Sequence, residues 1–327
     1  MATFGVSLCA ISGSPEISRA ATPRAMTTIS TRTWIDIAAL ALIWGGSFLA
    51  IRIALDEVPV FSSVAHRVLW AALALWLIVF AKRIRVPGSA RIWGAFLVMG
   101  CLNNVVPFSL MAWGQLHIET GLTAILNAAT AIWGVLVAAL VFPDERLTPN
   151  RLIGVLLGFL GVATAIGLSA FTSLDLRSLA QMAVILGTVS YALAGSWARK
   201  TLSDIPPLVS AAGMLTGSTL VMVPLAWFID GPMTVDMSAR TWGAVLYYSL
   251  VSTAAAYLLY YRILGAAGAG NLLLVTLLIA PVAIVLGSLV RGEALGLSAY
   301  AGFALLGIGL IILDGRVGNL LRKTQNA

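Results

Sequence analysis

Residues 121–167 read GLTAILNAATAIWGVLVAALVF, then PDERLTPN, then RLIGVLLGFLGVATAIG. The first and third parts are apolar runs, and the second part is a short polar hinge. At about 1.5 Å per residue, each run can cross a hydrocarbon core of roughly 30 Å as a helix. The stretch therefore predicts a helical hairpin that passes through a membrane twice.

A looser copy of this hairpin occupies residues 270–313, where GNLLLVTLLIAPVAIVLGSLV and LSAYAGFALLGIGLIIL flank RGEALG. Each copy has a glutamate shortly after its first run, Glu145 or Glu293, with a leucine two residues later. We expect each glutamate to cap or orient its hinge at a membrane surface. A hairpin that occurs twice indicates an internal repeat.

The composition is that of an integral membrane protein. Hydrophobic residues make up 60% of the chain, charged residues only 10%, and the mean hydropathy is +0.97. A soluble domain has about a quarter charged residues. The formal charge of +7 comes from basic residues that lie mostly in short loops. There they indicate topology and lipid contacts rather than nucleic-acid binding.

Apolar runs divide the chain into ten expected helices, with no segment long enough for a soluble domain. We place these spans at 34–54, 61–81, 92–115, 121–142, 151–170, 178–198, 207–229, 241–263, 270–290 and 297–314. The expected domains are a disordered cytoplasmic tail at 1–33, five-helix repeats at 34–170 and 178–314, and a second cytoplasmic tail at 315–327. The predicted fold class is thus all-α, with ten transmembrane helices.

The two repeats are expected to cross the membrane in opposite directions. A shift of 147 to 149 residues sets Trp44–Arg52 over Tyr191–Arg199 and Glu145 over Glu293. Because each repeat holds an odd number of spans, the second one enters the membrane inverted, an architecture that places a site at the midplane. Basic residues gather on the side of the N-terminus, so both termini are expected in the cytoplasm and the chain in a bacterial inner membrane.

The chain resembles the drug/metabolite transporter superfamily, in its EamA type. The resemblance rests on WGGSFLAIRIAL in the first span, Arg67 in the second, and the two hairpins, and it extends from residue 34 to 314. Within this family, the chain is most similar to YddG-like exporters of aromatic and other amino acids. The resemblance implies two inverted five-helix halves, a central cavity and export of small metabolites. Many members have a proline where this chain has Ala131, which leaves the helix bend there in doubt, whereas the second copy keeps Pro281.

Aromatic side chains are candidates for the walls of this cavity. Those in spans one, four, six and eight are Trp44, Trp133, Tyr191, Trp197, Tyr257 and Tyr261. Aromatic faces bind cationic groups and pack against apolar side chains. The alternative is lipid-facing packing or anchoring at the membrane interface, which accounts well for Trp34, Trp93, Trp227 and Trp242.

Polar side chains within the spans are the second group of candidates. They are Asn103, Asn104, Gln115, Asn127, Thr130 and Thr276, and Pro281 lies close to the last of them. Hydrocarbon leaves such groups unsatisfied, so each one either faces a cavity or forms a hydrogen bond between helices.

His66 and Arg67 lie about two turns into the second span, where a charge must pair, snorkel or face water. We weigh pairing of Arg67 with Asp56 or Glu57 against a role in holding an anionic substrate group or an outer gate. A titrating His66 is weighed against a local hydrogen-bonding role.

Some absences limit the possible functions. No acidic residue lies near the middle of a span, so a proton relay through a carboxylate has no candidate, and we expect exchange or gradient-driven efflux with at most weak coupling through His66. A phosphate loop, an HExxH metal pair and a nucleophile–base set are missing from the sequence, which disfavours an enzyme. We expect no cofactor, no metal, a small-molecule substrate and a monomer or weak dimer. The alternatives are a transporter of sugars, nucleotide-sugar-like solutes or drugs, and a membrane enzyme or structural membrane protein.

Overall fold

The computed structural model describes residues 30–143, 147–166, 175–267 and 269–313. All regular secondary structure in these residues is helical. In chain order the elements are α1 (Thr31–Ala54), α2 (Val60–Ala81), α3 (Ala90–Gly100), η1 (Cys101–Val105), α4 (Val106–Gly114), α5 (Thr120–Asn127), α6 (Thr130–Val141), α7 (Pro149–Ile166), α8 (Leu176–Thr201), α9 (Pro207–Ile229), α10 (Ala239–Leu246), η3 (Tyr247–Ala255), α11 (Ala256–Ala267), α12 (Ala269–Arg291) and α13 (Leu297–Leu313). The predicted tails and Glu145 lie outside the described residues, except for the start of α1.

The ten predicted spans are confirmed, with ends that differ by a few residues. α3, η1 and α4 form one span, α5 and α6 form a second, and α10, η3 and α11 form a third. Among the described residues, seven helices are long and apolar enough to cross a membrane. Shorter apolar helices cover Pro149–Ala165, Leu278–Arg291 and Leu297–Ile312.

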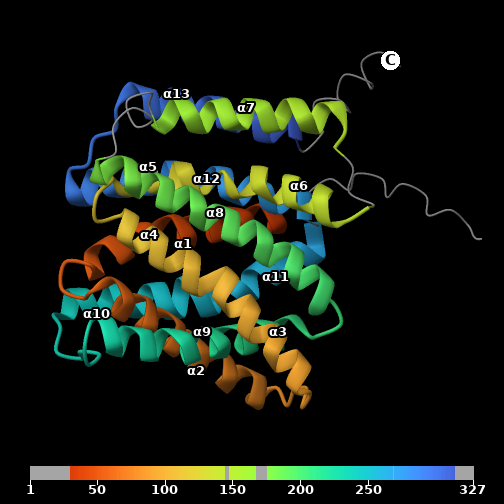
Figure 1. Cartoon of the computed structure of the whole chain (residues 1–327), viewed down its shortest axis with the longest axis vertical. Helices are drawn as coiled ribbons and strands as arrows, with labels where there is room; N and C mark the ends of the chain where they lie inside the picture. Colours follow the sequence, from red (N-terminus) through yellow and green to blue (C-terminus); the bar gives the residue numbers. More distant parts are fainter. Residues whose placement is uncertain (1–29, 144–146, 167–174, 268, 314–327) are drawn as a thin grey trace, which may run out of the picture.

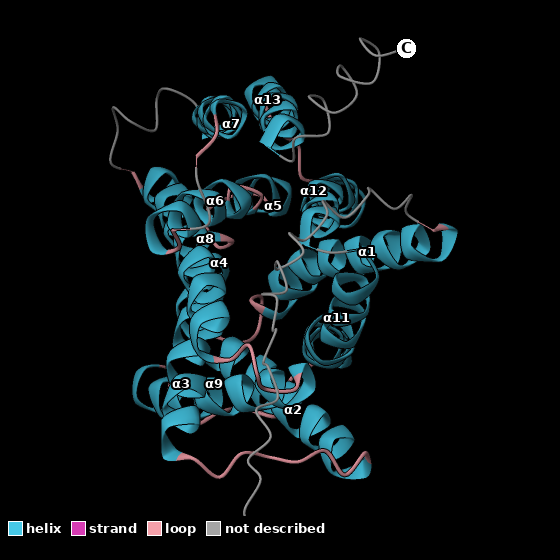
Figure 2. Cartoon of the chain, turned by 90° about the vertical axis from the view of Figure 1, so that its right-hand side faces the viewer, coloured by secondary structure: helices cyan, strands magenta, loops and turns pink. Residues whose placement is uncertain are grey.

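The helices stack in layers, and the two parts of the chain interleave within them (Figure 1). α7 and α13 form a pair at one edge, followed by a layer of α5, α6 and α12. α2, α3, α9 and α10 lie at the opposite edge. Figure 2 shows α4 and α8 on one side of the middle region and α1 and α11 on the other. Elements from residues 31–166 therefore face elements from residues 176–313 throughout the molecule.

The α7–α13 pair is held together by small residues. A Cβ atom added to Gly161 would lie 2.5 Å from the backbone nitrogen of Leu306, and one added to Gly309 would lie 2.7 Å from the nitrogen of Gly158. Both distances are shorter than packed atoms tolerate, so glycine is required for this close approach. These glycines of α7 and α13 thus serve helix packing.

Candidate functional site

Several helices lose regular α geometry about half-way along their length. π-helical turns occur at η1 in the third span and at η3 in the eighth span, and Pro281 lies inside α12. Wide π turns release backbone carbonyls from the helix ladder and are frequent at functional sites. The irregular turns come from both the first and the second part of the chain.

The fourth span is interrupted between α5 and α6 even though it has no proline there. Ala128 N donates to Ile125 O at 3.1 Å and Ala129 N to Leu126 O at 3.0 Å, which are tight i to i−3 bonds. Thr130 Oγ1 donates to the carbonyl of Asn127 at 2.7 Å. This bond satisfies one carbonyl at the point where the helix is interrupted. The bend that the sequence left in doubt at Ala131 therefore forms without proline. The side-chain oxygen of Asn127 is buried and accepts no hydrogen bond.

The π turn η3 is fixed to α1 by polar contacts. Trp44 Nε1 donates to Ser252 O at 3.1 Å, and Ser252 Oγ donates to Ile43 O at 3.0 Å. Tyr247 OH donates to the same Ile43 carbonyl at 3.0 Å. Trp44 also packs against Tyr260, with ring centroids 6.0 Å apart. Its indole therefore joins α1 to the irregular part of the eighth span.

Arg67 lies at the centre of a buried aromatic cluster. The residue is 9% exposed, and its Nε donates to Thr253 Oγ1 at 3.1 Å. The guanidinium carbon is 3.8 Å from the centroid of the Phe108 ring, which is a cation–π distance. The phenols of Tyr191, Tyr248 and Tyr257 are close enough to interact with it electrostatically. In the described part of the chain, no carboxylate pairs with Arg67.

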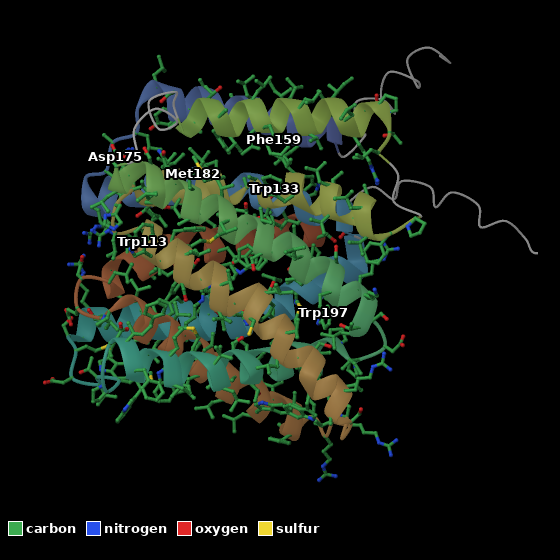
Figure 3. All side chains as sticks on the ribbon, in the orientation of Figure 1. Trp113, Trp133, Phe159, Asp175, Met182 and Trp197 are labelled. Carbon is green, nitrogen blue, oxygen red and sulfur yellow. The ribbon has the colours of Figure 1, made fainter. Side chains whose placement is uncertain are left out.

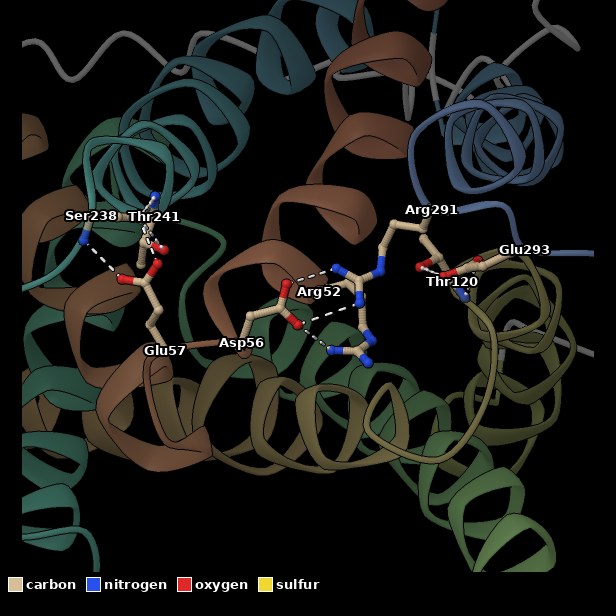
Figure 4. Close-up of polar contacts among 8 residues, drawn as sticks. All are labelled: Arg52, Asp56, Glu57, Thr120, Ser238, Thr241, Arg291 and Glu293. Atoms are coloured by element: carbon tan, nitrogen blue, oxygen red, sulfur yellow. Dashed lines mark hydrogen bonds and ion pairs between the residues drawn. The ribbon is translucent and has the colours of Figure 1, made fainter.

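Of the alternatives weighed for Arg67, pairing with Asp56 or Glu57 is wrong. Asp56 instead binds Arg52 at 3.1 Å and Arg291 at 2.7 Å (Figure 4). Glu57 accepts from the backbone nitrogen and the hydroxyl of Ser238, at 2.8 and 2.6 Å. Both carboxylates lie after the end of α1 and find partners at the surface, whereas Arg67 is directed inward between helices.

The π turn η1 contributes a polar link next to this cluster. Asn103 Nδ2 donates to Tyr257 OH at 3.1 Å and to Asn104 Oδ1 at 3.2 Å. Asn104 Nδ2 donates to Ser218 Oγ at 2.8 Å. Ser190 Oγ on α8 donates to the freed carbonyl of Leu102 at 2.6 Å. The third span is thus joined through its irregular turn to α8, α9 and α11.

His66, the neighbour of Arg67 in sequence, has a different environment. Its ring interacts with Thr234 O through Nε2 at 3.0 Å and accepts from Trp70 Nε1 at Nδ1, at 3.2 Å. These bonds assign the proton of a neutral imidazole to Nε2, because Nδ1 is occupied as an acceptor. The ring also meets the edge of Trp242 at 6.2 Å. His66 therefore anchors the segment between α9 and α10 to α2.

The remaining predicted site residues are spread over the molecule. Gln115 Nε2 donates to Phe48 O at 2.9 Å, and Trp197 Nε1 donates to Ala95 O at 3.1 Å toward the end of α8. Trp133 packs edge-on against Phe159 of α7, with centroids 5.0 Å apart, and faces that helix (Figure 3). Thr276 and Pro281 lie on α12. Tyr261 lies on α11, and its side chain is outside the described residues.

The structure therefore brings Arg67, Tyr191 and Tyr257 together and ties Trp44 to the same π turn. It places His66, Gln115, Trp133 and Trp197 in contacts away from this cluster. Sequence reasoning missed Phe108 and Thr253. The sequence did contain a signal for Thr253. Residues 252–256, STAAA, are a run of small residues with two hydroxyls, and they lie between aromatic residues near the middle of the eighth span. Two cavities open elsewhere, near Met99 and near Trp113, and no predicted site residue lines either one.

One end of the molecule is closed by polar contacts; we call it the Asp56 end. Each of these contacts joins residues 31–166 to residues 176–313, and the pairs are Asp56–Arg291, Glu57–Ser238, Ser62–Asp230, Glu119–Arg177 and Thr120–Glu293. Glu293 accepts from Thr120 N and Oγ1, both at 2.8 Å, and so caps the start of α5. At the opposite end, Asp36 of α1 pairs with Arg262 of α11.

The charges of the Asp56 end follow from these partners. The hydrogen bond from Arg291 holds the pKa of Asp56 below its ordinary value, with smaller contributions from the charges of Arg291 and Arg52. Hydrogen bonds from Ser238 hold the pKa of Glu57 below its ordinary value. Both carboxylates are therefore ionised at neutral pH.

Comparison with known proteins assigns the family. The EamA-like transporter family matches the chain twice, over residues 33–167 and 178–313, and the chain belongs to this family. It is 28% identical over 285 residues to "Uncharacterized transporter YvbV" of Bacillus subtilis (strain 168), covering 84% of this chain and 89% of that protein. It is 26% identical over 276 residues to "Probable terminal-alkyne amino-acid exporter" of Streptantibioticus cattleyicolor, covering 84% and 90%. A solved crystal structure with 18% identity has a TM-score of 0.62 over 92% of this chain, which shows a shared fold.

These findings define a multi-pass membrane transporter rather than an enzyme. Each family match contains one part of the chain with five helical spans. The Arg67 cluster and the polar link of η1 lie where these two parts meet.

Proposed function

We propose that this protein exports amino acids, aromatic or other neutral ones, from the cytoplasm. The solute would occupy a central site between the two parts of the chain and reach either side by alternating access. The observation that carries the proposal is the hydrogen bond between Asn103 of η1 and Tyr257 of α11, which joins the two parts at the level of their irregular turns. π turns inside α-helices are frequent at functional sites, and interrupted helices form the substrate sites of many transporters where two repeats meet.

The chemistry of the cluster supports an amphipathic solute. Aromatic rings of Phe108, Tyr191 and Tyr257 provide apolar walls, and Asn103 provides an amide. A relative named "Probable terminal-alkyne amino-acid exporter" aligns with 84% of this chain and with 90% of its own length. A nucleotide sugar would require several cations for its phosphates, and a cationic drug would favour a buried carboxylate. The cluster has one cation and no described carboxylate.

The described helices provide no carboxylate relay at mid-depth. Among the described residues, Asp36 is the acidic residue within a helix, and it lies near the start of α1 in an ion pair with Arg262. We therefore propose exchange or efflux down a solute gradient. The Asp56 end would face outward and both termini the cytoplasm, in agreement with the distribution of basic residues.

Counterflow in proteoliposomes tests this function. Vesicles loaded with one amino acid should accumulate the same labelled amino acid without an imposed pH gradient. The panel should include neutral amino acids, sugars and organic cations, with empty vesicles as the control. Carriage of a sugar or cation with no amino acid would assign another substrate class, and a strict requirement for a pH gradient would contradict the proposed energetics.

A further inference from the structure

Arg67 has unused hydrogen-bonding capacity in a buried position. A guanidinium group offers five N–H donors, and one of them, at Nε, is occupied by Thr253. Within the described part of the chain, neither terminal nitrogen of Arg67 donates to a protein oxygen. A buried charge without a counter-ion is unfavourable, so this arrangement suits a group that is supplied from outside the protein.

The surroundings of Arg67 determine the kind of group. Phe108 covers one face of the guanidinium at 3.8 Å, which leaves its edge as the direction for hydrogen bonds. Tyr248 OH is occupied by Ser63, and Tyr257 OH accepts from Asn103, so these phenols do not neutralise the charge. Other arginines nearby in sequence, such as Arg52, are paired with Asp56 at the surface. The site therefore has a single positive charge among aromatic rings.

We propose that Arg67 binds the carboxylate of the transported solute through its two terminal nitrogens. This inference rests on the proposed function and names the chemical class of its substrate: a monocarboxylate with a compact apolar or aromatic body. The planar fork of a guanidinium matches a carboxylate bidentately. A phosphate dianion would need additional cations, which the cluster does not have.

Thr253 positions the guanidinium for this role. Its hydroxyl donates to Tyr248 O, five residues earlier in the π turn, at 2.8 Å, so its lone pair is directed to Arg67 Nε. Nε is thereby fixed, and the two terminal nitrogens are left for the ligand. Because Arg67 lies on α2 and Thr253 on η3, a bound carboxylate contacts a group that both parts of the chain hold in place.

Binding to the purified protein in lipid nanodiscs tests the inference without transport. The ligands are matched sets: phenylalanine, phenylalanine amide and 3-phenylpropionate, with leucine and its amide as a second set. The readout is the ligand-induced shift in melting temperature and the resulting dissociation constant. We expect both acids of the first set to bind about tenfold or more tightly than the amide, because the amide lacks the charged oxygen pair.

Variants assign the effect to Arg67. Arg67→Gln should remove the difference between acid and amide, and Arg67→Lys should retain part of it, while the exposed Arg91→Gln on α3 should change neither. Equal affinity for acid and amide in the unaltered protein would overturn the inference, as would failure of every acid to bind. The first comparison needs no variant, so a variant that fails to fold does not affect it. Binding of 3-phenylpropionate without any amino acid would support Arg67 as a carboxylate site and contradict amino-acid export.

Discussion

His66 and Arg67 show how adjacent residues on one helix acquire separate roles. Successive side chains on an α-helix are rotated by about 100°, so neighbours face different partners. Arg67 faces the aromatic cluster, whereas His66 faces Thr234 and Trp70. A buried neutral imidazole with both nitrogens occupied is a structural group, which agrees with the local hydrogen-bonding alternative weighed for this histidine.

Replacing His66 should therefore affect stability more than transport. His66→Ala leaves the carbonyl of Thr234 and the indole N–H of Trp70 without their partner, and an unsatisfied buried group costs about 1–3 kcal/mol. We expect a lower melting temperature in detergent and an unchanged pH profile of counterflow. Trp70→Phe is the matched control because it removes only the bond to Nδ1. A pH profile that shifts in His66→Ala would instead identify His66 as a titrating group.

In the π turn η3, the neighbouring hydroxyls of Ser252 and Thr253 also have separate roles. Thr253→Val keeps the shape of the side chain and removes the acceptor for Arg67 Nε. We expect weaker uptake through a several-fold higher KM, with a small change in melting temperature. Ser252→Ala removes an equally buried hydroxyl, whose bond goes to Ile43 of α1. A larger rise in KM for Ser252→Ala than for Thr253→Val would contradict the assigned role of Thr253.

The sequence predicted the spans well because apolar length alone identifies a membrane helix. It did not predict the irregular turns, since a π turn depends on carbonyl partners such as Trp44 and Ser190, which belong to other helices. The sequence left the bend after Asn127 open because no proline stands there, and the structure shows i to i−3 bonds at this point without one. Arg67, Tyr191 and Tyr257 could each be predicted as cavity candidates from their place within a span, but not as one cluster. Phe108 could not, because nothing in a single phenylalanine indicates that it covers a guanidinium.

The Asp56 end is closed by contacts between residues that lie far apart in the chain. Asp56 is held by Arg291, which lies 235 positions further along the chain. Asp56→Asn removes the charge that attracts Arg52 and Arg291 and should open this end more often. A cysteine introduced at Ser63, in a background without Cys9 and Cys101, reports on access because it lies one turn from Arg67 on α2. We expect a several-fold faster reaction with a membrane-impermeant thiol reagent added at this end.

Asp175→Asn is the matched control for this experiment. Asp175 lies at the same end and caps its own helix α8 through Ser178 N at 2.8 Å. It makes no described contact across the two parts of the chain, so its replacement should leave the labelling rate unchanged. Equal acceleration by both variants would mean that closure does not depend on the Asp56 ion pairs.

Low pH should open the Asp56 end, because it protonates Asp56. The Arg291 hydrogen bond lowers the pKa of Asp56 from its ordinary value of 3.8 in the closed arrangement. A lowered pKa means that the carboxylate favours closure above about pH 4 and that this contribution is lost as pH falls through the lowered pKa. Labelling at Ser63→Cys, after correction for the reactivity of the thiol reagent, should therefore increase below about pH 4. In Asp56→Asn, which has no carboxylate at this position, the rate should already be high and should not rise further. A rise of equal size in that variant would assign the acid response to another group at this end, and Glu57, whose pKa is lowered by Ser238, would be the next to replace.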